Sequence, residues 1–249
     1  MADNRMTLAP ITLKEPYVND YATREAYKTL RTNLMFCGSD KKVLVFTSCV
    51  PDEGKSTITM GLARTLAEIG KKVLLIDADM RRSTLFARYG ARGKCSGLSQ
   101  LLSGQVSFNE AVFATQYPGF HILFAGYYPP NPVELLDSEA FRNLVAAVRE
   151  AYDYVLIDTP PVGSIIDAVV VAKCADGAVM VVANSKNTGR FARTCKQQLE
   201  RAGCPIVGAV LNMTTRRNDK YYRSSKYYRY GRGYGYGYGY GQEKRKIEK

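Results

Sequence analysis

The sequence contains no tryptophan, a single histidine (His121) and no two cysteines in a CxxC spacing. Without a His or Cys cluster there is no ligand set for a zinc site, and six scattered cysteines are typical of reduced thiols in a cytosolic protein. No apolar run approaches the ~18–20 residues that cross a bilayer, and "MADNRMTLAP" lacks the apolar segment of a signal peptide. We therefore expect a cytoplasmic chain whose contact with a membrane is peripheral.

The positive charge of the chain is concentrated near its C-terminus. The 249 residues include 35 Lys and Arg against 23 Asp and Glu, a net charge of +12. From Arg216 to Lys249 there are eleven Lys and Arg against three Asp and Glu, so this segment carries +8 and residues 1–215 carry +4. A basic tail indicates attraction to an anionic membrane surface, a nucleic acid or an acidic partner.

The same segment holds half of the 18 tyrosines. Nine lie in "YYRSSKYYRYGRGYGYGYGYG", residues 221–241, namely Tyr221, Tyr222, Tyr227, Tyr228, Tyr230, Tyr234, Tyr236, Tyr238 and Tyr240. The stretch has no hydrophobic periodicity and is rich in Gly, which predicts a disordered tail. Its composition alone suits two roles equally well: acceptors for a modifying enzyme, or a low-complexity segment that binds RNA or itself.

Short β-branched apolar runs alternate with helical patterns along the rest of the chain. Six runs are typical of strands buried on both faces of a sheet: 42–48, 72–79, 120–126, 154–160, 177–184 and 206–212. Helical patterns cover 22–36, 55–69, 108–114, 134–151, 164–175 and 188–202. This alternation predicts an α/β fold with a doubly wound, mainly parallel sheet and helices on both faces. We expect an N-terminal extension over 1–20, one domain over 21–218 and the tail over 219–249.

The first of these strands runs into a turn that is typical of phosphate binding. Within "SCVPDEGKST", residues 48–57, Gly54-Lys55-Ser56 matches the end of the GxxxxGK[ST] loop, although Cys49 replaces its first Gly. Backbone N–H groups of such a loop bind phosphate oxygens, Lys55 would bridge the β- and γ-phosphates, and Ser56 would ligate Mg²⁺. We predict ATP contacts from Pro51, Asp52, Glu53, Gly54, Lys55, Ser56 and Thr57. Because carboxylates repel an anion, we expect Asp52 and Glu53 to point outward.

Two further predicted strands end in aspartates, Asp77 with Asp79 in "VLLIDADMRRS" and Asp158 in "YVLIDTPP". Each Asp alone is better explained as a helix N-cap or turn residue. Three of them beside a phosphate loop instead indicate metal ligands and a proton acceptor for a transfer reaction. We predict that Lys55, Asp77, Asp79 and Asp158 are catalytic and that Ser56, Asp79 and Asp158 bind the metal. If strand geometry continues to Asp79, the Asp77 and Asp79 carboxylates project to the same side.

Five segments resemble, in order, the bacterial tyrosine kinases of capsule and exopolysaccharide synthesis. They are "VPDEGKST", "LLIDADMRR", "AGYYPPNPVELLDS", "VLIDTPPV…DA" and "VGAVLNM", and the resemblance covers about residues 20–240. It implies a P-loop nucleotide-binding fold, ATP and Mg²⁺ as cofactors, and autophosphorylation of the nine tail tyrosines. The balance then favours phosphoacceptors over an RNA-binding tail.

Some positions depart from the pattern of these kinases. Asp52 stands where many members have Gly, and Ser83 stands where many have Pro. The oligomerisation motif E-x-x-R-x-x-R corresponds here to Glu25, Lys28 and Arg31, and Lys28 lacks the planar fork of an arginine.

The resemblance also implies partners. These are other copies of the chain in a homo-oligomeric ring, a transmembrane polysaccharide co-polymerase that activates the kinase at the inner face of the membrane, and a cognate tyrosine phosphatase. No specific nucleic acid is expected. The main alternative is a P-loop ATPase of the partition or division-site type without kinase activity. Those ATPases carry a signature Lys four residues before the last Gly of the loop, where this chain has Val50. A simple RNA-binding module would leave the phosphate loop without a role.

Overall fold

The fold described here is that of a computed structural model, which describes residues 8–14, 20–90, 95–184 and 189–214. All but one of these residues belong to a compact unit, Met1–Met213. The predicted tail with its nine tyrosines, and the predicted boundary between residues 218 and 219, lie outside the described residues.

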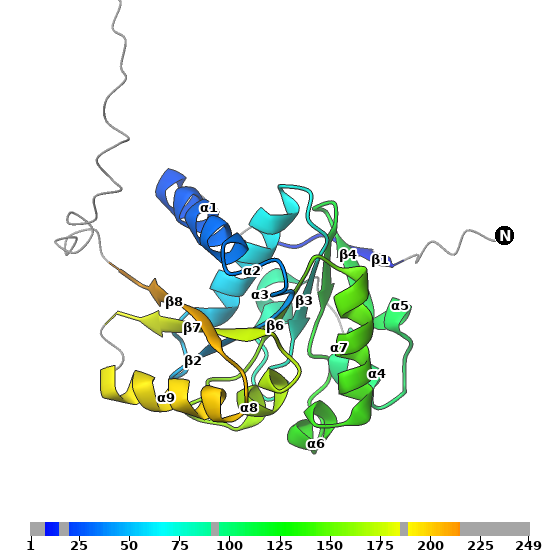
Figure 1. The fold of residues 1–249 in the computed structure, drawn as a ribbon. Helices are drawn as coiled ribbons and strands as arrows, with labels where there is room; N and C mark the ends of the chain where they lie inside the picture. The colour runs from blue at the N-terminus through cyan, green and yellow to red at the C-terminus, as the bar shows by residue number, and fades with distance from the viewer. Residues whose placement is uncertain (1–7, 15–19, 91–94, 185–188, 215–249) are drawn as a thin grey trace, which may run out of the picture. The chain divides into compact units, whose positions relative to one another are not determined.

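An eight-stranded sheet forms the centre of the fold (Figure 1). Its strands are β1 (Ala9–Ile11), β2 (Val43–Ser48), β3 (Val73–Asp77), β4 (Val112–Thr115), β5 (Phe120–Leu123), β6 (Tyr154–Asp158), β7 (Gly177–Ala183) and β8 (Ile206–Asn212). They lie in the order β1-β4-β5-β3-β6-β2-β7-β8. Every neighbouring pair is parallel except β4 and β5. The mainly parallel sheet and its six predicted strands are therefore confirmed.

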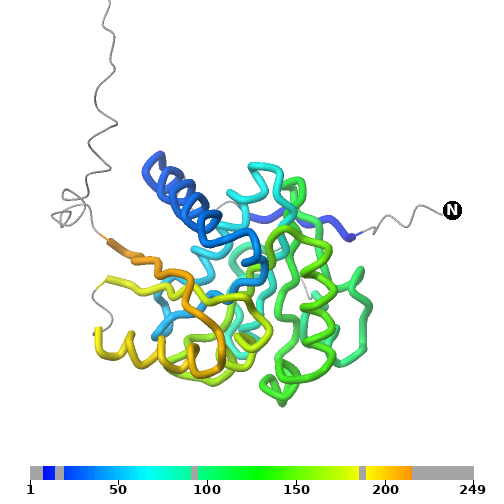
Figure 2. The backbone as a smooth tube through the Cα atoms, in the orientation of Figure 1, coloured from blue at the N-terminus to red at the C-terminus, as the bar shows by residue number. Residues whose placement is uncertain are grey.

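Helices cover both faces of this sheet (Figure 2). They are α1 (Tyr21–Met35), α2 (Lys55–Ala67), α3 (Leu85–Tyr89), α4 (Leu98–Leu102), α5 (Phe108–Ala111), α6 (Pro132–Leu136), α7 (Glu139–Ala151), α8 (Asp167–Ala172) and α9 (Gly189–Arg201). Alternate strand residues face opposite layers. Leu44 and Phe46 of β2 belong to the core cluster that includes side chains of α1, α2 and α3. Val43 and Val45 belong to the cluster with α7, α8 and α9.

The helix predicted over 134–151 is two helices, because Ser138 interrupts it. The Ser138 hydroxyl accepts a hydrogen bond from the Phe141 N–H, at 3.2 Å, and donates one to the Leu135 carbonyl, at 2.7 Å. A serine at this position caps the start of α7 and ends the regular backbone of α6.

The helix predicted over 108–114 is wrong in its second half. Helix α5 ends at Ala111, and strand β4 begins at Val112 and pairs antiparallel with β5. Strand β1, which pairs with the other side of β4, lies within the predicted N-terminal extension. Neither strand was predicted, because β1 has three residues and β4 has four, too few to establish a period of two.

Candidate active site

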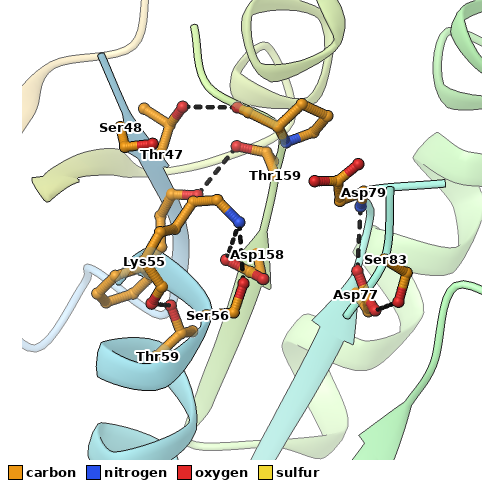
Figure 3. A network of polar contacts seen from close by, with 12 residues as sticks. Thr47, Ser48, Lys55, Ser56, Thr59, Asp77, Asp79, Ser83, Asp158 and Thr159 are labelled. Carbon is orange, nitrogen blue, oxygen red and sulfur yellow. Dashed lines mark hydrogen bonds and ion pairs between the residues drawn. The ribbon is translucent and has the colours of Figure 1, made fainter. Parts of the chain in front are cut away.

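Three neighbouring strands bring the predicted site residues together. Strand β6 lies between β2 and β3, and its last residue, Asp158, is the register partner of Phe46 on β2 and of Asp77 on β3. Helix α2 starts at Lys55 after the loop that follows β2. Figure 3 shows Lys55, Ser56 and Asp158 close together where β6 ends, with Asp77 and Asp79 at the end of the adjacent strand β3.

Lys55 and Asp158 form a buried ion pair. The Lys55 Nζ lies 2.7 Å from the Asp158 Oδ1, and the two side chains are 9% and 1% exposed. The same Nζ donates to the Ser56 hydroxyl at 3.2 Å. Because little water reaches this pair, the ammonium is held in place by the protein.

Asp77 is a second buried carboxyl beside the first. Burial raises the pKa of Asp77, and the neighbouring charge of Asp158 raises it further. Burial also raises the pKa of Asp158, although Lys55 opposes that effect. The Ser83 hydroxyl donates to the Asp77 Oδ2, a bond that proline at position 83 could not make. With one cation for two buried carboxyls, Asp77 retains a proton at higher pH than an ordinary aspartate.

Asp79 lies in a different environment from Asp77. Strand β3 ends at Asp77, so the condition for projecting both carboxylates to one side is not met. The Asp79 N–H donates to the Asp77 Oδ1 at 3.1 Å, and the Asp79 Oδ1 accepts from the Arg82 N–H at 3.0 Å. In Figure 3 the Asp77 carboxylate lies beside Ser83, whereas that of Asp79 points away from it. Asp79 is partly exposed, whereas Asp77 is fully buried.

The start of α2 is suited to an anion. Gly54 occupies the N-cap with a φ of 84°, no side chain caps the helix, and its first turn holds no acidic residue. A Cβ at Gly54 would lie 2.1 Å from the Asn212 Nδ2, so only glycine fits there. The backbone N–H groups of the first turn thus have no side-chain acceptor, which is the arrangement that binds phosphate at helix N-termini. These residues fit a nucleotide.

The prediction that Glu53 points outward is wrong. Glu53 is 1% exposed. Its Oε2 accepts from the N–H groups of Cys49 and Val50, at 2.7 and 3.0 Å, and its Oε1 accepts from the Ala183 N–H at 2.7 Å. Three backbone donors compensate the buried charge, so the carboxylate fixes the loop instead of facing the phosphates.

Asp52, in contrast, is exposed and has a φ of 61°. This left-handed conformation favours glycine, and aspartate is among the few other residues that tolerate it. The backbone therefore gives a physical reason for the glycine that many similar kinases have at this position. Pro51 is also exposed, and Thr57 is partly buried on α2.

Two residues of the site, Asp167 and Asn212, were not predicted. Arg81 forms a two-pronged ion pair with Asp167, Nε to Oδ2 at 2.8 Å and Nη2 to Oδ1 at 3.2 Å, and Asp167 is fully buried. Asn212 donates from its Nδ2 to the Glu53 carbonyl at 2.8 Å. Asn212 ends a strand, and Asp167 lies in the quoted "VLIDTPPV…DA" segment. Their positions in the sequence could therefore have marked them as candidate site residues. Their partners, however, are 86 and 159 residues away in the sequence.

The predicted oligomerisation residues lie on α1. Lys28 Nζ is 2.7 Å from Glu25 Oε1 in an exposed i,i+3 pair. Arg31 turns inward, and its Nη1 donates to the Thr65 carbonyl of α2 at 2.7 Å. Arg31 thus joins α1 to α2, while Glu25 and Lys28 lie on the outer surface.

A metal at this site would need ligands from outside the protein. Among the described residues, no group of three or more His, Cys, Asp or Glu side chains could hold a metal ion. Ser56, Asp79 and Asp158 offer hard oxygen donors, which suit Mg²⁺, an ion that usually keeps water and phosphate oxygens in its shell. This donor set fits magnesium bound together with a nucleotide. None of the described helices is both long and apolar enough to span a membrane.

Comparison with known proteins gives consistent relatives. Residues 51–190 match the family model described as an AAA domain. Tyrosine-protein kinase CpsD of Streptococcus agalactiae is 37% identical over 190 residues, which is 76% of this chain and 83% of CpsD. Tyrosine-protein kinase YwqD of Bacillus subtilis is 36% identical over 211 residues, 84% of this chain and 87% of YwqD.

Solved structures agree with these relatives. The kinase domain of the Escherichia coli tyrosine kinase ETK has a TM-score of 0.73 and 33% identity, and the match covers 87% of this chain and 80% of that one. The Pyrococcus furiosus cell division ATPase MinD has a TM-score of 0.58 over 69% of this chain and 71% of that one, but at 23% identity it shows a shared fold alone. The chain belongs to the bacterial tyrosine kinases of capsule and exopolysaccharide synthesis, and it is an ATP-binding enzyme that phosphorylates protein tyrosine.

Proposed function

We propose that this kinase phosphorylates the tyrosine cluster of its own C-terminal tail, in trans between copies, and thereby regulates the synthesis and export of capsular or extracellular polysaccharide. The observation that carries the proposal is the buried Lys55–Asp158 pair beside Asp77, next to an uncapped helix N-terminus. A kinase with nine tyrosines in a Gly-rich tail carries an acceptor in its own sequence.

The site residues divide the work of phosphoryl transfer. Gly54, Lys55 and the first N–H groups of α2 would hold the phosphates of ATP. Ser56, Asp79 and Asp158 would hold Mg²⁺, which neutralises charge on the phosphoryl oxygens when bound.

Asp77 is the group suited to accept the phenolic proton of the incoming tyrosine. A carboxylate whose pKa is raised towards the working pH is a stronger base than an ordinary one. Its hydrogen bonds from Ser83 and from the Asp79 N–H keep it oriented.

Charge favours entry of the unmodified tail and release of the modified one. The tail segment 216–249 carries +8, and the site contains three aspartates, the buried Asp77 and Asp158 and the partly exposed Asp79. Each phosphotyrosine adds about −1.5 to −2 charge at neutral pH, so roughly four to six modifications cancel the positive charge. Phosphorylation should then weaken both the assembly and its attachment to an anionic membrane. Light scattering of inactive and fully phosphorylated protein, at matched concentration and salt, should give the smaller mass for the phosphorylated form, and equal masses would contradict this step.

Transfer in trans is supported by the reach of the tail and by self-association of the chain. A flexible segment of about thirty residues has an r.m.s. reach of roughly 30 Å, which is enough to extend to a neighbouring subunit. The outer face of α1, with Glu25 and Lys28, is the surface we assign to self-association, and Arg31 supports it by anchoring α1 to α2. The activating partner would be a transmembrane co-polymerase, which would hold the kinase at the inner face of the membrane, and a cognate phosphatase would reverse the reaction.

Mixing two defective proteins tests the proposal. Lys55→Met protein supplies an intact tail without an active site, and a tail-deleted protein supplies the active site. With Mg·ATP, peptide mass spectrometry should find phosphate on the tail of the Lys55→Met chain only when both proteins are present. If both are folded and associate but no transfer occurs, the reaction is confined to one chain. ATP hydrolysis without any tyrosine phosphate would instead favour the ATPase alternative.

A further inference from the structure

A cavity of about 680 Å³ lies beside α2, between α1, α3 and the segment after β1. Its walls include Thr23 and Tyr27 of α1, and Arg88 of α3. Thr57 is the only residue of the predicted nucleotide site among those that line it. The volume is in the usual range for small-ligand sites, which is roughly 300–1,000 Å³.

The lining of this cavity combines aromatic rings with positive charge. Four aromatic residues line it: Tyr27 and Tyr117, which are partly exposed, and Tyr89 and Phe120, which are buried. Among the residues that the structure describes, three cationic ones also line it, Lys14, Arg64 and Arg88, and none of the lining residues is Asp or Glu. A ligand that complements these walls has an aromatic body and a negative charge.

The cations differ in how firmly they are held. Arg64 lies with its Cζ 4.7 Å from the centroid of the Tyr117 ring, and its Nε is 3.1 Å from Glu68 Oε1. Lys14 and Arg88 are exposed, and within the part of the chain that the structure describes neither takes part in an ion pair. One guanidinium is therefore pre-positioned, and two further charges are available at the rim.

The aromatic wall is fixed to α2. The Tyr27 hydroxyl donates to the Thr57 carbonyl at 3.0 Å, and burial raises the pKa of Tyr27 to about 12, so the phenol stays neutral. A Cβ at Gly61 would lie 2.3 Å from the Tyr27 Cζ, which shows how closely the ring packs on the helix. The Lys14 N–H donates to the Tyr89 carbonyl at 3.0 Å, which joins the segment after β1 to the end of α3. The cavity is thus largely preformed.

We infer that this cavity binds a phosphotyrosine side chain from the C-terminal tyrosine cluster. This inference rests on the proposed function, because that reaction supplies the phosphotyrosines. The ring would stack among the aromatic side chains, and the phosphate dianion would meet the Arg64, Arg88 and Lys14 charges. An unmodified tail segment of charge +8 is repelled by the same three cations, so binding depends on phosphorylation.

Peptide binding to the full-length chain tests the inference. The probe is a fluorescent peptide of residues 221–230, "YYRSSKYYRY", with phosphate on Tyr227 and Tyr228. The receptor is the Asp77→Asn chain, which we expect to be folded and unable to modify its own tail. Fluorescence anisotropy should show that this peptide binds at least about tenfold more tightly than its unmodified form or a form with phosphoserine at both positions.

Variants of the cavity identify the site. Arg88→Ala, which removes a rim charge, and Ala87→Trp, which fills the cavity from an exposed position, should each weaken binding about tenfold or more. Arg201→Ala is the matched control, because Arg201 is also an exposed arginine, lies at the end of α9 and is not among the residues that line the cavity. It should leave binding unchanged.

Three results would overturn the inference. One is equal affinity for the phosphorylated and unmodified peptides, and another is full affinity in both cavity variants when their melting temperatures match the parent. The third is equal binding of an unrelated phosphotyrosine peptide, which would overturn the tail as the source. Because the peptides are synthetic, these results do not depend on whether the enzyme modifies its tail, which mass spectrometry of the wild-type protein decides separately.

Discussion

Replacing Lys55 with methionine should destabilise the protein as well as inactivate it. The substitution leaves Asp158 buried, with its register neighbour Asp77 also buried, and it removes the one cation among the described residues that forms an ion pair with either carboxyl. Removing one partner of a buried ion pair costs about 3–5 kcal/mol. Asp158 can take up a proton instead, because burial already raises its pKa, so we expect a net loss of about 2–4 kcal/mol at pH 7.5.

This loss of stability should depend on pH and on whether Asp158 is present. The folded-state pKa of Asp158 lies above its unfolded value, so the native state binds more protons and loses stability as pH rises through that pKa. Removal of Lys55 raises the pKa of Asp158 further, so the stability deficit of the variant should grow as pH rises and shrink as pH falls. In the double variant Lys55→Met/Asp158→Asn both charges are gone, and stability should return to within about 1 kcal/mol of wild type.

Thermal unfolding followed by circular dichroism, without nucleotide, measures the effect. For a domain of this size about 2–4 °C corresponds to 1 kcal/mol, so the single variant should melt roughly 4–16 °C lower. Lys196→Met is the matched control, because Lys196 and Glu200 form a pair with the same 2.7 Å separation on an exposed surface. That change should cost less than about 1 kcal/mol. An unchanged melting temperature for Lys55→Met, or no recovery in the double variant, would refute the reasoning.

Three further substitutions test other parts of the site. Asp77→Asn should abolish kinase activity yet stabilise the fold by about 1–3 kcal/mol at pH 8, because the carboxyl with its raised pKa destabilises the native state as it ionises. In a pH series of melting curves this gain in stability should vanish below about pH 4. Glu53→Gln can replace only part of the three backbone hydrogen bonds, so we expect the free energy of unfolding to fall by about 2–4 kcal/mol. Binding of a fluorescent ATP analogue should weaken roughly tenfold, and unchanged binding would show that the loop does not need this carboxylate. Arg81→Lys keeps the charge beside Asp167 but loses the planar fork, so urea unfolding should show a loss of about 1–2 kcal/mol. Arg81→Ala should cost more, and an unchanged stability of Arg81→Lys would contradict the two-pronged contact.

The phosphate loop and the strand ends could be predicted because their signals are local. A run such as "VLIDTP" carries its own evidence for a buried strand that ends in a carboxylate, and Gly54-Lys55-Ser56 marks a helix start within three residues. The parallel sheet then follows from the alternation of strands and helices. Its parallel order brings Asp77 and Asp158 together, because the carboxyl ends of parallel strands lie at one edge.

The errors arose where distant contacts decide the outcome. Glu53 looked unfavourable in an anion-binding loop, but it is compensated by N–H groups that include one from Ala183, 130 residues away. The environment of Asp79 depends on where β3 ends, and the regular sequence around it does not mark that point. The Arg81–Asp167 pair links separate segments in the same way, and no local pattern specifies such a partner.

The most direct test of the central claim is the intact mass of purified protein after incubation with Mg·ATP. Wild-type chains should gain several phosphoryl groups, up to nine, all mapping by peptide mass spectrometry to tyrosines between Tyr221 and Tyr240. Lys55→Met chains, treated identically and shown to be folded at the assay temperature, should gain none. Phosphate on the tail of pure Lys55→Met protein, or a wild-type protein that gains phosphate only outside the tail, would contradict the account.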